Sequence, residues 1–281
     1  MCGGEELDKL EYTIEGVVGE ILLREYLKTL GLSVTLIKKA KRTGIFIDGE
    51  PATVRRLIKN GMRLTLMLPD ERSEGIRAID IPLKAYFEDG ELAVFYKPTN
   101  MPTHPSRGNS LPTLAEAVMA RYGENFVFRA ITRLDRDTSG LVLVAKNPVS
   151  AARLSESMKR GEIFKRYEAT VCGVPSPSHG VIDKPIRREC EGSIKRICAP
   201  DGKRAITEYT VKAVIGENAV CDIVLHTGRT HQIRVHMASI GHPLDGDFLY
   251  GERGESSYYL ECKELRFPHP KSGEIITVKI D

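Results

Sequence analysis

The sequence contains no uncharged apolar run of the roughly 20 residues that a helix needs to cross a lipid bilayer. Its first residues are acidic and include no apolar core, so they do not have the pattern of a secretory signal. We therefore expect a cytoplasmic protein that does not interact with membranes.

None of the cysteines stands in a C-x-x-C pair, and they are spread too thinly along the chain for a disulfide scaffold. We expect reduced thiols, mostly packed as small apolar side chains. The six cysteines are Cys2, Cys172, Cys190, Cys198, Cys221 and Cys262.

The motifs of several large enzyme classes are also missing. There is no G-x-G-x-x-G, no Walker A loop, no H-E-x-x-H and no internal repeat, so dinucleotide, nucleoside triphosphate and zinc-protease functions lose their usual support. Four histidines stand close together in the sequence, but their spacing does not place two of them at i and i+4 on one helical face. They are His226, His231, His236 and His242. We expect polar histidines or RNA contacts there, with a metal site as the alternative.

The net charge is only +3, but the charges are unevenly distributed. Residues 38–63 carry eight basic residues against two acidic ones, and residues 184–204 carry seven against three. Local basic patches on a nearly neutral chain suit a protein that binds a polyanion, whereas a solvated surface is the alternative explanation.

With 41% hydrophobic and 28% charged residues in 281, the chain has the composition of a globular protein with one large domain or two unequal ones.

The first part of the chain has the pattern of a strand, two helices and short strands. Apolar residues at helical spacing predict a helix over residues 19–30, and Gly31 suits its end. A second helix is predicted over residues 34–43, with Ser33 as its N-cap and Gly44 as its end. Short strands are predicted over residues 45–47 and 63–68.

Strand patterns dominate after a polar segment at residues 70–80 that is typical of a linker. Asp89-Gly90 predicts a hairpin, and Thr113 with Glu116 predicts a capping box at the start of a helix. Hairpins with few regular crossovers favour an α+β fold with a mixed, mainly antiparallel sheet and flanking helices. We expect a small N-terminal α/β module over residues 1–69, a linker over 70–80 and the main domain over 81–281.

One group of polar residues leads directly into a buried strand at residues 141–145. Within residues 132–140, Asp135 stands between Arg133 and Arg136. A carboxylate held next to positive charge stays ionised at neutral pH and can act as a nucleophile or a base. A salt-bridged turn that only starts the strand is the alternative.

A second group of polar residues occupies positions 225–247. Arg229 and Arg234 lie in the run T-G-R-T-H-Q-I-R-V-H and suit binding of a phosphate or a carboxylate. The run G-H-P-L-D-G-D follows it closely.

These motifs, in this order, resemble the RluA family of pseudouridine synthases. The runs that carry the resemblance are R-L-D-R-D-T-S-G-L, K-R-Y-E-A, T-G-R-T-H-Q-I-R-V-H and G-H-P-L-D-G-D. The resemblance extends over residues 80–281 and implies an isomerase that converts uridine in RNA to pseudouridine. That reaction adds and removes nothing, so the resemblance implies no cofactor and no metal.

The resemblance also implies roles for single residues. Asp135 matches the catalytic aspartate that acts at the ribose C1′ of a flipped uridine. Tyr167 matches the tyrosine that packs on the target base, and Arg234 matches the arginine that pairs with the catalytic aspartate. The other residues that we assign to the substrate are Arg133, Arg136, Arg229, His231 and Leu260.

Residues 1–69 resemble the αL motif, a small RNA-binding module of a ribosomal protein and of bacterial tyrosyl-tRNA synthetases. The cations of its second helix that we assign to RNA are Lys38, Lys39, Lys41 and Arg42. The chain has Gly61-Met62 where the motif usually has Gly-Asp. Because of this module, we expect the substrate to be structured ribosomal RNA, most of all that of the large subunit, rather than transfer RNA. We also expect a monomer.

The sequence departs from the RluA pattern at two places. Thr132 replaces the usual histidine before Arg-Leu-Asp, and Glu261-Cys262 replaces a common His-Ala, so the choice of substrate is affected more than the activity. Two alternatives stay open from the sequence. One is an RNA-binding or ribosome-assembly factor without catalysis, and the other is a metal-dependent hydrolase that uses the histidines with Asp135 and Asp137.

Overall fold

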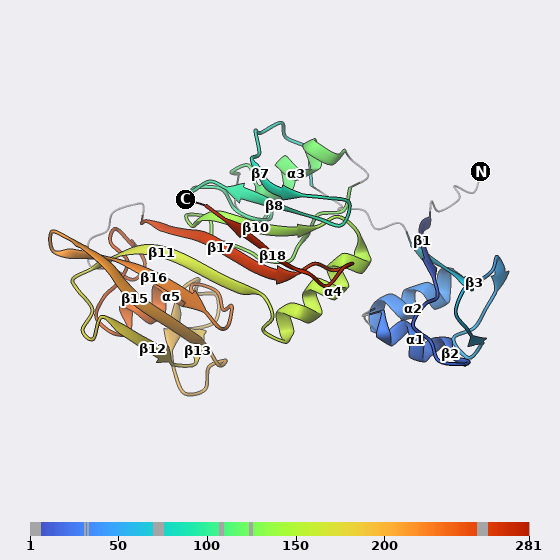
Figure 1. The fold of residues 1–281 in the computed structure, drawn as a ribbon. Helices are drawn as coiled ribbons and strands as arrows, with labels where there is room; N and C mark the ends of the chain where they lie inside the picture. The colour runs from blue at the N-terminus through green and yellow to red at the C-terminus, as the bar shows by residue number, and fades with distance from the viewer. Residues whose placement is uncertain are drawn as a thin grey trace.

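The chain folds into a small N-terminal module and a larger body built around a ten-stranded sheet (Figure 1). The structure is a computed structural model that describes residues 7–30, 32, 34–69, 76–106, 110–123, 126–251 and 258–280. Most of the predicted linker therefore lies outside the described residues. No helix in these ranges is long and apolar enough to span a membrane.

The N-terminal module contains an antiparallel four-stranded sheet in the order β1-β6-β3-β4, and two helices pack on it. Its core includes Leu23, Leu27, Ile47, Leu64 and Leu66, all fully buried. The bounds are β1 Leu7–Thr13, β2 Ile21–Leu22, α1 Leu23–Thr29, α2 Val34–Thr43, β3 Ile45–Ile47, β4 Glu50–Pro51, β5 Leu57–Ile58 and β6 Arg63–Pro69.

The second helix and the strand after it agree with the predicted bounds. The first helix was predicted too long, because Gly19 has a φ of +69° and β2 pairs with β5 before the helix begins at Leu23. Gly31 and Ser33, the predicted end and N-cap, lie outside the described residues.

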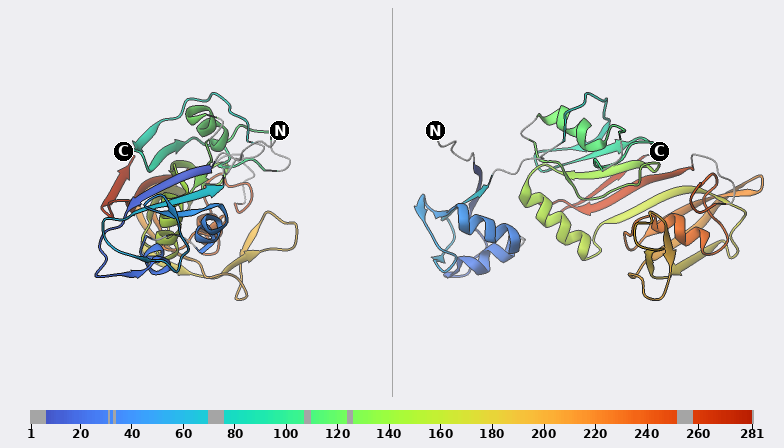
Figure 2. Two further views of the ribbon diagram at one scale, coloured as in Figure 1. Left: turned by 90° about the vertical axis from the view of Figure 1, so that its right-hand side faces the viewer. Right: turned by 180° about the vertical axis from the view of Figure 1, so that it is seen from behind.

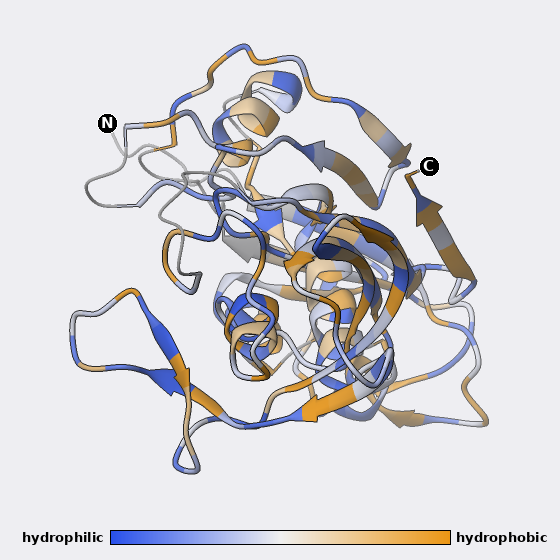
Figure 3. Ribbon diagram, turned by 90° about the vertical axis from the view of Figure 1, so that its left-hand side faces the viewer, coloured by the Kyte–Doolittle hydropathy of each residue, from blue (hydrophilic) through white to orange (hydrophobic). Residues whose placement is uncertain are grey.

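The large sheet has the strand order β12-β15-β16-β11-β17-β10-β8-β7, and β18 and β9 pair with β17 and β10. Among its described strand pairs only β10 and β17 run parallel, so the predicted mixed, mainly antiparallel sheet is confirmed. The bounds are β7 Ala85–Glu88, β8 Leu92–Lys97, β9 Arg129–Ala130, β10 Ser139–Ala145, β11 Phe164–Cys172, β12 His179–Asp183, β15 Ile206–Ile215, β16 Asn218–Leu225, β17 Leu260–Pro268 and β18 Ile275–Lys279. Figure 3 shows hydrophobic residues, coloured orange, along the strands of this sheet.

Three helices and a two-stranded ribbon complete the body. Their bounds are α3 Leu114–Tyr122, α4 Pro148–Lys159, α5 Gln232–Ala238, β13 Ile186–Arg188 and β14 Arg196–Cys198. The predicted capping box is confirmed, because the Thr113 side chain accepts from the Glu116 backbone and the Glu116 side chain accepts from the Thr113 backbone. Helix α4 lies at the end of the body that faces the N-terminal module (Figure 2), and its Val149 packs into the module's core.

Candidate active site

A pocket of about 310 Å³ opens beside the start of β10 and is walled by β11, β17 and the segment before α5. It contains seven of the eight residues assigned to catalysis or substrate from the sequence: Arg133, Asp135, Tyr167, Arg229, His231, Arg234 and Leu260. The eighth, Arg136, does not line the pocket. Its guanidinium binds both oxygens of Asp137 at 2.8 Å instead.

The loop that carries Asp135 is held by backbone and hydroxyl hydrogen bonds. The Thr103 hydroxyl donates to the carbonyl of Leu134 at 2.9 Å, and the Thr132 hydroxyl accepts from the Leu143 amide at 2.9 Å. Gly140 ends the loop with a φ of +113°, and a Cβ there would lie 2.4 Å from the Cys262 backbone. The loop can therefore pass this close to β17 only with glycine at the position.

Lys97 supports the same loop from behind and was missed from the sequence. Its side chain is fully buried, and its Nζ donates to the carbonyls of Pro98, Met101 and Arg136 at 2.8, 2.6 and 3.1 Å. Burial lowers the pKa of Lys97 to about 8, although nearby Asp137 and Asp135 oppose the shift. A lysine at the end of the apolar strand β8 was the signal that could have identified it.

The Asp135 carboxylate makes no hydrogen bond and no ion pair with any described residue. It lies close enough to His231, Arg234 and Tyr258 to affect the titration of each of them. A carboxylate that is held by its backbone but has no side-chain partner is available to a bound substrate.

Arg234 does not pair with Asp135, and this prediction was wrong. Its Nε and Nη2 bind the two oxygens of Asp247 at 2.7 Å, and both side chains are buried. Asp247 also accepts from the backbone amides of Leu249 and Tyr250. Burial acts to lower the pKa of Arg234, but the hydrogen bonds to Asp247, together with the electrostatic effects of Tyr258, Asp247 and Asp135, outweigh it and raise the pKa.

The guanidinium of Arg234 contacts aromatic rings as well, with Tyr258 at 4.6 Å and Tyr250 at 5.0 Å from the ring centroids. A planar guanidinium that is bound by one carboxylate and packed against aromatic rings has little freedom to bind a second carboxylate. Arg234 therefore acts on Asp135 only as a neighbouring positive charge.

Tyr167 and Lys165 point to the same side of β11, because alternate residues of this strand are buried. Burial raises the pKa of Tyr167 well above its ordinary value, and its side chain lies against that of Cys262. Burial lowers the pKa of Lys165, which also lines the pocket. Lys165 was missed from the sequence, although its spacing of two from Tyr167 places it on the same face.

The four histidines have separate partners. His226 binds Glu208, His231 binds the Tyr250 hydroxyl, His236 binds the Thr207 hydroxyl and the Lys184 carbonyl, and His242 binds the Cys172 carbonyl. In the described ranges no three His, Cys, Asp or Glu side chains are grouped as metal ligands.

The family model for RNA pseudouridylate synthase matches residues 91–239, which is more than half of the chain. The chain belongs to this family. The predicted resemblance is thereby confirmed, and the protein is a pseudouridine synthase, an isomerase that acts on RNA. The match includes β8, the Asp135 loop, β11 and α5, and it leaves the N-terminal module unassigned.

Relatives extend the similarity over most of the enzyme. It is 37% identical to the uncharacterized RNA pseudouridine synthase YjbO of Bacillus subtilis, over 90% of this chain and 92% of that protein. It is 36% identical to ribosomal large subunit pseudouridine synthase D of Vibrio parahaemolyticus, over 81% of this chain and 76% of that protein. The solved structure of human RNA pseudouridylate synthase domain containing 1 covers 71% of this chain and 83% of its own, with a TM-score of 0.60 and 26% identity.

Proposed function

We propose that this pseudouridine synthase modifies uridines in structured RNA of the large ribosomal subunit, with Asp135 acting at the ribose C1′ of a flipped nucleotide. The observation that carries the proposal is that Asp135, which has no side-chain partner among the described residues, lies in a pocket walled by Tyr167 and Leu260. Three relatives named as ribosomal large subunit pseudouridine synthase D support the choice of RNA.

The proposed mechanism follows from the chemistry of the pocket. A stacked uridine must leave its helix before any group can reach C1′, and the ring of Tyr167 then offsets the lost stacking. With Asp135 assisting at C1′, the C1′–N1 bond breaks, the uracil rotates and a C1′–C5 bond forms. The C5 proton is lost and N1 gains one, so the product is an isomer and the balance needs no oxidant, reductant or added group.

The substrate is tested by mapping pseudouridines in total RNA from a parent strain, a deletion strain and a strain that carries only Asp135→Asn. We expect sites in large-subunit ribosomal RNA to disappear in both altered strains, while those in transfer RNA stay. Loss of transfer RNA sites alone would overturn the proposed substrate.

Tyr167→Ala should lower the rate far more than Tyr167→Phe, because the proposed task of the ring is to stack on the flipped base. Stacking of a base on an aromatic ring contributes about 1–3 kcal/mol, which corresponds to a rate loss of roughly 5- to 150-fold. The raised pKa of Tyr167 keeps its hydroxyl protonated at neutral pH and so argues against a role as a base. Single-turnover rates of both variants measure this, and equal losses would assign the role to the hydroxyl.

We further propose that the N-terminal module binds RNA through α2, whose Lys38, Lys41 and Arg42 are exposed. Changing all three to glutamine should reduce the slope of log affinity against log salt by about two to three, because each lost phosphate contact removes about 0.7–0.9. Binding titrations from low to high salt measure the slope. A control variant changes Lys84, Lys212 and Lys279, three exposed cations of the large body, to glutamine. If the slope of log affinity against log salt is equal in both variants, the cations of α2 form only a solvated surface and do not bind RNA.

A further inference from the structure

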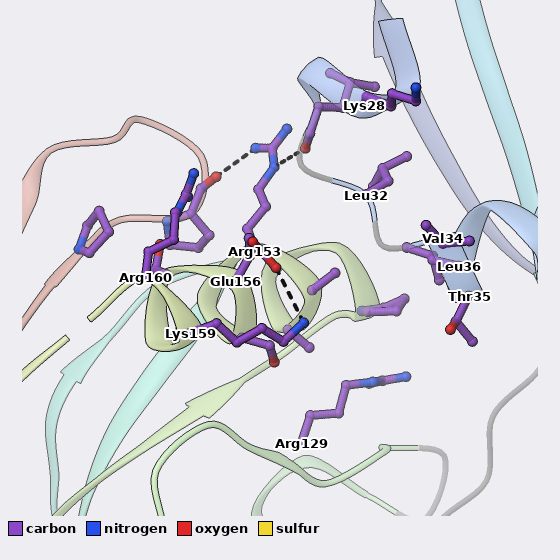
Figure 4. A pocket seen from close by; sticks show the side chains of 18 of the residues that line it. Lys28, Leu32, Val34, Thr35, Leu36, Arg129, Arg153, Glu156, Lys159 and Arg160 are labelled. Atoms are coloured by element: carbon purple, nitrogen blue, oxygen red, sulfur yellow. Dashed lines mark hydrogen bonds and ion pairs between the residues drawn. The ribbon is translucent and has the colours of Figure 1, made fainter. Parts of the chain in front are cut away.

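A cleft of about 990 Å³ lies between the N-terminal module and helix α4. One wall is formed by α1, α2 and the segment between them, and the other by β9, α4 and the turn after β17. Figure 4 shows Lys28 and Thr35 on the module's side, with Arg129, Arg153, Lys159 and Arg160 across from them. The cleft is distinct from the catalytic pocket, and the two share no lining residue.

The lining of the cleft is strongly basic. Among the described residues that line it, Glu156 is the only one with a carboxylate, and it binds Lys159 at 3.3 Å. Against this single acid stand six cations: Lys28, Lys39, Arg129, Arg153, Lys159 and Arg160. Small-molecule pockets are mostly apolar with a few polar groups, so this lining favours an extended anion.

Arg153 joins the two walls. Its Nε donates to the carbonyl of Leu30 at 2.5 Å, and its Nη1 donates to the carbonyl of Pro270 at 2.6 Å. Within the described ranges its charge has no carboxylate partner. The module is therefore attached to α4 by a residue whose positive charge is left for a ligand.

Two elements of the fold contribute residues both to the cleft and to the catalytic pocket. The last turn of α4 supplies Met158 to the pocket and Lys159 to the cleft. Arg129 of β9 lines the cleft, and Ile131, two residues later, lines the pocket. An RNA strand that leaves the pocket can pass over the end of α4 and the β9 segment directly into the cleft.

We infer that the cleft holds the sugar–phosphate backbone of the substrate RNA that flanks the target uridine, and leads it from the pocket to α2. The inference rests on the proposed function only in taking RNA as the substrate. The charges lie on opposite walls and come from separate helices and a strand, which suits a chain of phosphates. A single phosphate group is bound more often by converging backbone amides at one helix N-terminus.

The test is the variant Arg129→Gln/Lys159→Gln/Arg160→Gln in the full chain, with a large-subunit ribosomal RNA transcript as the probe. None of the three residues lines the catalytic pocket. We expect the salt slope of binding to fall by about two to three. KM should rise, while the single-turnover rate at saturating RNA stays within about twofold of the parent.

The control is again Lys84→Gln/Lys212→Gln/Lys279→Gln. It matches the cleft variant in charge, and both sets include cations with carboxylate partners: Lys159 and Arg160 in the cleft, and Lys212 and Lys279 in the control. The control should keep the parent's slope. A cleft variant with the control's slope would overturn the inference.

Two further measurements separate the outcomes. A photoreactive amino acid at the exposed cleft residue Ser155 should crosslink to RNA beside the target uridine, and crosslinks confined to distant regions would contradict the inference. Inorganic tripolyphosphate that binds the parent but not the cleft variant, with an unchanged RNA slope, would assign the cleft to a free polyanion. The salt slope reports phosphate contacts with any RNA, so this test of the cleft is valid even if the parent forms no pseudouridine in this transcript. Absence of pseudouridine there would overturn only the proposed substrate.

Discussion

Asp135→Asn is expected to lower the rate of pseudouridine formation by more than about a hundredfold, or about 2.7 kcal/mol of barrier, without changing RNA binding. The carboxylate has no hydrogen bond or ion pair with any described residue, so its replacement removes no such contact from the described part of the folded chain. The loss should therefore appear in the chemical step. Single-turnover rates at saturating RNA, with affinity and unfolding temperature measured beside them, test this.

The matched control is Asp137→Asn, the same change two residues later. The Asp137 carboxylate binds the partly exposed guanidinium of Arg136 and does not line the pocket. We expect a rate loss below about tenfold for it. Retention of more than about one percent of the parent rate by Asp135→Asn, or equal losses in the two variants, would contradict the catalytic role of Asp135.

Arg234→Ala is expected to destabilise the fold by about 3–5 kcal/mol, because it leaves the fully buried Asp247 carboxylate without its charged partner. Arg234→Lys keeps the charge but loses the two-pronged hydrogen bond, so it should recover only part of this loss. Denaturant unfolding of each variant measures the change. Arg229→Ala is the matched control, since Arg229 lines the same pocket and its Nε donates to a backbone carbonyl, that of Arg204, and to no carboxylate of the described residues.

A double-mutant cycle tests the pair of Arg234 and Asp247. Asp247→Asn should also destabilise the fold, and Arg234→Ala combined with Asp247→Asn should cost less than the sum of these two single changes. Additive losses would contradict the Arg234–Asp247 pair.

The sequence by itself determined the elements whose signals are local. Helix α2 and strand β3 have their predicted bounds, and the capping box of α3 forms as expected. Periodicity, caps and turn residues act between neighbours in the chain, so they hold whatever the rest of the fold does. Seven residues of the catalytic pocket were also found from the sequence, because motifs of the family carried them, whereas Lys165 was not.

Strand β17 was not predicted, and only the tertiary structure decided its place. It runs through the middle of the sheet although Glu261 and Glu264 are buried in it. Glu261 accepts from the Tyr96 hydroxyl, and Glu264 pairs with Arg166 on the adjacent strand β11. A buried strand is recognised in a sequence by its pattern of apolar residues. Here buried charged residues, whose partners lie far away in the chain, interrupt that pattern.

The partners of buried charges were decided in the same way. Nothing in the spacing of Arg234 and Asp135 shows that Asp247, on the turn after α5, takes both arms of the guanidinium. Nothing in β8 shows that Lys97 will find three carbonyls behind the catalytic loop. A buried charge binds whichever polar groups the packed chain brings within reach, because leaving it unpaired costs several kcal/mol, and that proximity is a property of the assembled fold.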